Sequence, residues 1–138
     1  MVKRLVTWGK RQNLAQIPQI TSYVLDPDER IRASVALVLG KIITGQRLNL
    51  EVEEAIKALE TLSQDSSSEV RKLAIKSLGR VFSPKIVPTL ELALKDVDLE
   101  IIEIASEILQ NYKRTLPITR EEGEKTLPEN IAIKEAAQ

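Results

Sequence analysis

DPDERIRASVALVLGK, residues 26–41, recurs at residues 65–80 as DSSSEVRKLAIKSLGR. In both copies the opening aspartate is followed by Ile or Val five positions later, by Arg six later, by Leu thirteen later and by Gly fourteen later. A degraded third copy begins at Asp96, with Ile102 in the place of Arg. The signature positions Gly9, Gly40, Gly79 and Gln110 are separated by 31, 39 and 31 residues, a period typical of stacked helical repeats.

Each repeat predicts two helices, which we term A and B in chain order. The B helices are expected to begin at residues 26–29 and 66–69, where Asp, Ser and Glu side chains suit the first turn. Gly40 and Gly79, each followed by a cation, are expected to end them. The A helices are expected at about residues 14–25, 50–63 and 84–95. The fold class that follows is an all-α solenoid of about three helix pairs.

The aligned B helices predict which side chains are buried. Positions that recur at helical spacing form three apolar columns, and such stripes face a core. Only four aromatic residues occur in the whole chain, so the core is expected to be aliphatic. The columns are Ile31, Val70 and Ile101; Val35, Ala74 and Ala105; and Leu39, Leu78 and Leu109.

The composition excludes several kinds of mechanism. The 138 residues contain no Cys and no His, which removes thiol catalysis, disulfides, an imidazole base and zinc sites built on these residues. We find no phosphate-binding loop, serine elbow or metal-ligand motif, so we expect no enzymatic activity, no cofactor and no metal. No apolar run reaches the roughly 18 residues that a membrane span needs, and no signal peptide is recognised. A cytoplasmic protein without a membrane partner is the expectation.

The pattern of Asp, then Ile or Val with Arg, then Leu-Gly, on the second helix of a pair, resembles the HEAT repeat. It is most similar to the short HEAT-like repeats of phycobilisome lyase subunits. The resemblance covers about residues 1–112 and implies a repeat solenoid over residues 1–114, followed by a C-terminal tail, 115–138. In that family the Asp and Arg side chains of neighbouring repeats form a hydrogen-bonded ladder. The resemblance gives this structural role to Asp26, Arg32, Asp65, Arg71 and Asp96.

The resemblance also places the B helices on the concave, partner-binding side of the solenoid. Along this side the exposed rows change from apolar through cationic to acidic. A protein segment with a hydrophobic anchor flanked by acidic residues would suit the first two of these rows. The alternative is that the rows are ordinary solvated helix faces. The candidate partner-binding residues are Val6, Leu37, Lys41, Lys72, Lys76, Arg80, Glu103 and Glu107.

Three functions remain open at this point. The first is a non-catalytic scaffold or adaptor that binds another protein. The second, implied only by the variety of repeat, is an accessory subunit of a bilin lyase or isomerase. The third is a nucleic-acid-binding scaffold, which four N-terminal cations suggest weakly because no stacking aromatics accompany them. These cations are Lys3, Arg4, Lys10 and Arg11.

Both ends of the array raise further expectations. The array opens with a B helix that lacks its A partner, so the chain is expected either to continue a longer array or to self-associate through that end. The last B helix is unusually apolar, and the tail, residues 115–138, is expected to cover it, the alternative being a linker.

Overall fold

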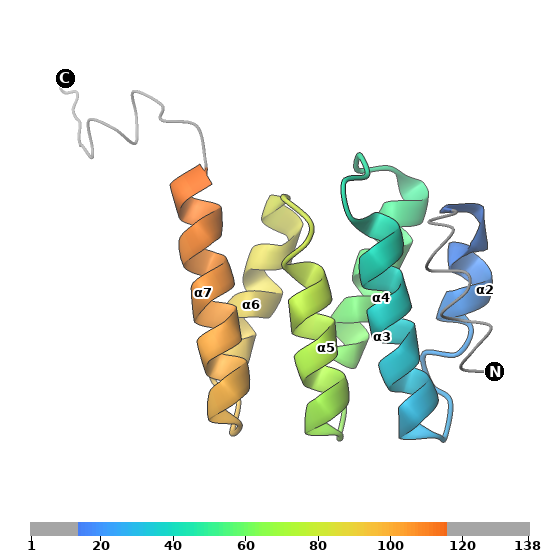
Figure 1. Ribbon diagram of the computed structural model, residues 1–138, viewed down its shortest axis with the longest axis horizontal. Coiled ribbons are helices and arrows are strands. Elements are labelled where there is room, and N and C mark those ends of the chain that lie inside the picture. The colour runs from blue at the N-terminus through green and yellow to red at the C-terminus, as the bar shows by residue number, and fades with distance from the viewer. Residues whose placement is uncertain (1–13, 116–138) are drawn as a thin grey trace, which may run out of the picture.

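A computed structural model describes residues 14–115, and all regular structure in this range is helical (Figure 1). The expected all-α fold class is confirmed. Residues 1–13 and 116–138, which include Val6, the N-terminal cations and the tail, lie outside the described residues. With η for a short 3-10 helix, the elements are η1 (Leu14–Gln16), α2 (Ile17–Thr21), α3 (Glu29–Ile43), α4 (Leu50–Leu62), α5 (Ser68–Leu78), η2 (Pro84–Ile86), α6 (Val87–Ala93) and α7 (Leu99–Thr115).

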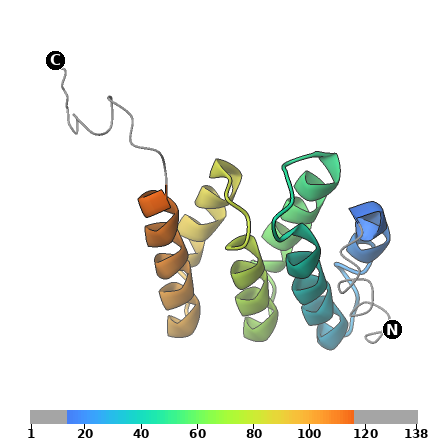
Figure 2. The ribbon, with the colours of Figure 1, turned by 45° about the horizontal axis from the view of Figure 1, so that its top comes forward.

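The helices form two layers. The B helices α3, α5 and α7 stand side by side, and the A helices α2, α4 and α6 form the layer behind them (Figures 1 and 2). Each B helix packs against the A helix of its own pair, and also α3 against α5 and α5 against α7. The loops that follow α3 and α5 lie along one edge of the stack together with the end of α7. We term this edge, at the top of Figure 1, the loop edge.

The repeated aspartate shapes the turn before each B helix. Asp26 and Asp65 each accept a hydrogen bond from the amide two residues later, with both N···O distances 2.9 Å, and Asp96 does the same at 2.8 Å. The residues that cap α3 and α5 are therefore Asp28 and Ser67, two positions beyond each aspartate. The expected cap at Asp26 was wrong, because its carboxylate is occupied by the turn.

The signature glycines allow the B helices to approach one another. Gly40 does not end α3, as expected, since the helix continues to Ile43. A Cβ atom at Gly40 would overlap the Ser77 hydroxyl and lie 2.7 Å from the Ser77 Cβ atom on α5. Gly79 does cap the end of α5, and a Cβ atom there would lie 2.7 Å from the Cδ1 atom of Ile108 on α7. Gln110, at the same position of α7, is exposed, and no B helix follows it in the described range.

The core is aliphatic and follows the predicted columns. Eight of the nine column residues are buried, with exposures of 8% or less. Ile31 is the exception: it is half-buried and packs against the core from one side. Within residues 14–115, no helix is both long enough and apolar enough to cross a membrane.

Candidate functional site

Two arginine–aspartate pairs link consecutive repeats. Arg32 donates from Nε and Nη2 to the two carboxylate oxygens of Asp65, at 2.7 and 3.0 Å. Arg71 makes the same forked contact with Asp96, at 2.9 and 3.2 Å. These four side chains are between 9% and 15% exposed, so solvent screens the pairs less than it would a surface pair.

Each arginine also ties its own repeat together. Arg32 Nη1 donates to the carbonyl oxygens of Asp26 and Pro27, and Arg71 makes the equivalent contacts with the turn before α5. One guanidinium thus joins the turn of its own repeat to the aspartate of the next. The Asp26 carboxylate has no arginine partner among the described residues, so only its carbonyl contributes to the ladder there.

The ladder changes the acidity of its carboxylates. Burial raises the pKa of Asp65, but the hydrogen bonds from Arg32 and from the Ser67 amide outweigh burial and leave this pKa below its usual value of 3.8. The pKa of Asp96 is lowered in the same way, with Arg71 and the Asp98 amide as donors against the effect of burial. Both carboxylates are therefore charged at neutral pH, as a salt-bridged ladder requires.

The B face, which we define as the outward side of α3, α5 and α7 that carries the candidate partner-binding residues, is partly neutralised. Lys72 lies 2.8 Å from a carboxylate oxygen of Glu100 and 3.6 Å from one of Glu69, and its side chain is only 19% exposed. The hydrogen bond to Glu100 raises the pKa of Lys72. Lys72 therefore joins α5 to α7 and is less available to a partner than its sequence position indicates.

Cations without a carboxylate partner remain nearer the loop edge. Lys76 and Arg80 are exposed, and neither forms a salt bridge with any of residues 14–115. Arg80 donates one hydrogen bond, to the Thr44 hydroxyl at 3.3 Å. On either side of them, Leu37 and Lys41 on α3 are half-buried, while Glu103 and Glu107 on α7 are exposed. The B face thus presents an apolar position, a positive zone and an acidic row.

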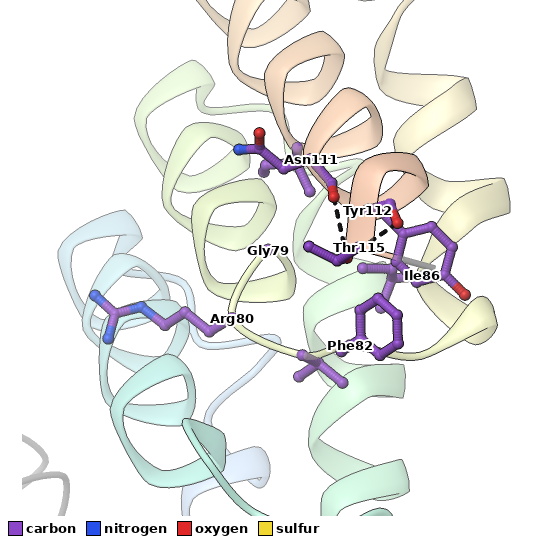
Figure 3. Close-up of a pocket in the computed structure, with 9 residues that line it drawn as sticks. Gly79, Arg80, Phe82, Ile86, Asn111, Tyr112 and Thr115 are labelled. Atoms are coloured by element: carbon purple, nitrogen blue, oxygen red, sulfur yellow. Dashed lines mark hydrogen bonds between the residues drawn. The ribbon is translucent and has the colours of Figure 1, made fainter. Parts of the chain in front are cut away.

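The loop edge carries a groove that the sequence pattern did not predict. It consists of two hollows, of about 180 and 370 Å³, which share Arg80, Val81 and Phe82. The smaller hollow lies between the loop after α5 and the last turn of α7, with Ile86 in its wall (Figure 3). The larger hollow adjoins the loop after α3. We term the two together the loop-edge groove.

An aromatic pair forms one side of the smaller hollow. The rings of Phe82 and Tyr112 have centroids 4.8 Å apart and are tilted by 40°. Phe82 remains 59% exposed, although it is a large apolar side chain. The signal in the sequence was an aromatic residue between the glycine that ends α5 and the Ser83-Pro84 start of the next helix, where polar residues are usual. Repeat alignment missed Phe82 because it lies outside the repeated phrase.

The groove is surrounded by positive charge. The three stretches that form it, residues 45–48, 79–86 and 111–115, contain no acidic residue, although the chain as a whole has no net charge. Glu53 of α4 pairs with one of these cations, Lys85, at 3.8 Å. Cations suit the C-terminal ends of helices, which explains part of this asymmetry. The five cations of the three stretches are Arg47, Arg80, Lys85, Lys113 and Arg114.

The site has the features of a binding surface. Among residues 14–115, no group of three acidic side chains converges as a metal site requires. Hollows lined by exposed aromatic and cationic side chains, on a stack of regularly spaced helices, suit contact with another molecule.

The paired helices, their two-layer stacking and the arginine–aspartate ladder define a helical-repeat solenoid of the HEAT class. A family model described as sister chromatid cohesion protein PDS5 matches residues 6–135. The chain belongs to this family. The match supports the HEAT-repeat class expected from the sequence, and it gives no support to the closer likeness to phycobilisome lyase subunits. No curated protein matches the chain.

Proposed function

We propose that this chain is a non-catalytic HEAT-type scaffold that binds another protein on its B face. The observation that carries the proposal is the positive zone at Lys76 and Arg80, which are exposed and have no carboxylate partner among residues 14–115. Half-buried Leu37 supplies an adjacent apolar contact. A partner segment with an apolar anchor and acidic neighbours complements this arrangement in shape and charge.

The ladder supports this function by holding the B helices at fixed positions. Because each arginine bonds both its own turn and the next repeat, the side chains of α3 and α5 are presented at a constant spacing. A partner then binds a preorganised surface and loses less free energy to ordering it. Lys72, held by Glu100, belongs with this supporting framework in our proposal, and Lys76 is the better candidate for contact.

The family description gives the partner a context. We propose that the bound protein is part of a chromosome-associated assembly, since the matching family is described by sister chromatid cohesion. This context replaces the cytoplasmic expectation in our proposal. The bilin lyase alternative is not carried forward, because the match names a cohesion family.

The test compares two matched charge reversals. Lys76→Glu changes the B face, whereas Lys57→Glu makes the same change at an exposed lysine of α4, in the other layer. Tagged full-length variants are used to capture partners from the source cells, and the captured proteins are quantified by mass spectrometry. We expect Lys76→Glu to lose proteins that wild type and Lys57→Glu both retain, with unchanged melting temperatures. Equal capture by all three would refute binding on the B face.

A further inference from the structure

We propose that the loop-edge groove is a second docking site, which takes an acidic peptide segment through one large apolar side chain. The site lies at the ends of α5 and α7 and goes beyond the B face, where the proposed scaffold function is located. The occupant we infer is a segment of another protein.

The shape of the smaller hollow favours a single side chain. Its volume of about 180 Å³ is below the roughly 300–1,000 Å³ typical of small-molecule sites. Buried Ile86 and half-buried Ile108 give it an apolar lining, and Phe82 stands 59% exposed beside them. Covering an exposed aromatic ring at the centre of a contact is typical of the residues that dominate binding energy. An apolar anchor would bury what the isolated chain leaves in water.

The charges around the hollow favour an acidic partner. Every stretch that forms the groove contributes at least one cation and no acid. Arg47, Arg80, Lys113 and Arg114 are exposed, and none of them forms a salt bridge with a described residue. Figure 3 shows the Arg80 side chain extending away from Phe82, so this cation stands beside the apolar hollow and does not fill it. Carboxylates that flank the anchor would meet these cations at the rim.

The aromatic geometry favours a peptide over a nucleic acid. A single-stranded nucleic acid binds by stacking its bases on open aromatic faces along a cationic track. Here Phe82 and Tyr112 lie against each other, with ring centroids 4.8 Å apart, and together they wall a hollow of side-chain size. The pair therefore offers a pocket for an anchor more than a platform for successive bases.

The experiment titrates isotope-labelled full-length protein with a short capped peptide that has one central Phe flanked by Glu on both sides. Versions with Leu or Trp in the central position complete the set. We expect NMR shift changes concentrated at residues 79–86 and 111–115 with at least one of these peptides. Phe82→Ala should weaken that binding about tenfold, which is the loss of a typical anchor contact. Leu25→Ala, which removes an 80% exposed apolar side chain at the opposite edge, should leave it unchanged.

Four results would overturn the proposal. The first is that none of the three peptides shifts these residues. The second is equal binding by a peptide with Ser in the central position, because the attraction would then be charge alone. The third is tighter binding of a single-stranded oligonucleotide that also depends on Phe82, which would make the groove a nucleic-acid site. The fourth is peptide binding only after the substitutions Leu116→Ser and Ile118→Ser, which would show that the chain's own tail is the occupant.

Discussion

Replacing Gly40 by Ala tests whether the signature glycine serves helix packing. Alanine favours a helix interior by about 0.8–1.0 kcal/mol over glycine, so helix propensity alone predicts a more stable protein. The structure predicts the opposite, since the new Cβ atom would overlap the Ser77 hydroxyl and lie 3.2 Å from the Ser77 backbone Cα atom. That hydroxyl also donates a buried hydrogen bond of 2.7 Å to the carbonyl of Ala36.

The magnitude follows from these opposing contributions. Overpacking a tight helix contact costs about 1–3 kcal/mol, and displacing the Ser77 hydroxyl from its hydrogen bond costs about 1 kcal/mol more. Subtracting the propensity gain leaves a net loss of about 1–3 kcal/mol in the free energy of unfolding. For a chain of this size, a loss of 1 kcal/mol lowers the melting temperature by roughly 4 °C. Urea titration followed by circular dichroism measures the free energy directly.

Two further variants isolate the cause. Gly79→Ala would press on the flexible end of Ile108 and on no side chain fixed by a hydrogen bond, so we expect it to cost less than about 1 kcal/mol. Ser77→Gly removes the atoms that Gly40→Ala meets, and the two changes together should show a favourable coupling in a double-mutant cycle. If Gly40→Ala is as stable as the wild type, or more stable, close packing at Gly40 is not what the glycine provides.

The remaining predictions concern the ladder. Arg32→Ala should lower the free energy of unfolding by about 1–3 kcal/mol, because it leaves the largely buried Asp65 carboxylate without a cation. Arg30→Ala, at a side chain 84% exposed, should cost less than about 0.5 kcal/mol in the same urea titrations, and equal losses would remove the ladder from the account of stability. Since the folded-state pKa values of Asp65 and Asp96 lie below the usual 3.8, their contribution is present above that pH and is lost as the pH falls through the folded-state values. Urea midpoints should therefore drop below about pH 4, and should drop less in Asp65→Asn than in the wild type; parallel curves for the two would contradict this assignment.

The repeated phrase determined the helices and the core, for local reasons. Apolar residues at helical spacing select one buried face, and polar residues at the turns set where a helix begins, so Val35, Val70 and Leu78 were correctly placed without any tertiary information. The arginine and aspartate positions also followed from the repeat, because a stack brings equivalent positions of neighbouring repeats together. The sequence did not indicate that Lys72 would be held by Glu100, since that contact depends on the offset between α5 and α7.

Tertiary structure alone decided the roles of Gly40 and Phe82. A glycine near a predicted helix end suggests a stop, and only the position of Ser77 on the next helix shows that it permits close approach. Phe82 lies outside the repeated phrase, and its pairing with Tyr112 joins residues from two different repeats. Local pattern records which face of a helix is buried, because burial repeats with the helical turn. The spaces between loops arise from how helices are offset in the stack, so the loop-edge groove became visible only in the assembled fold.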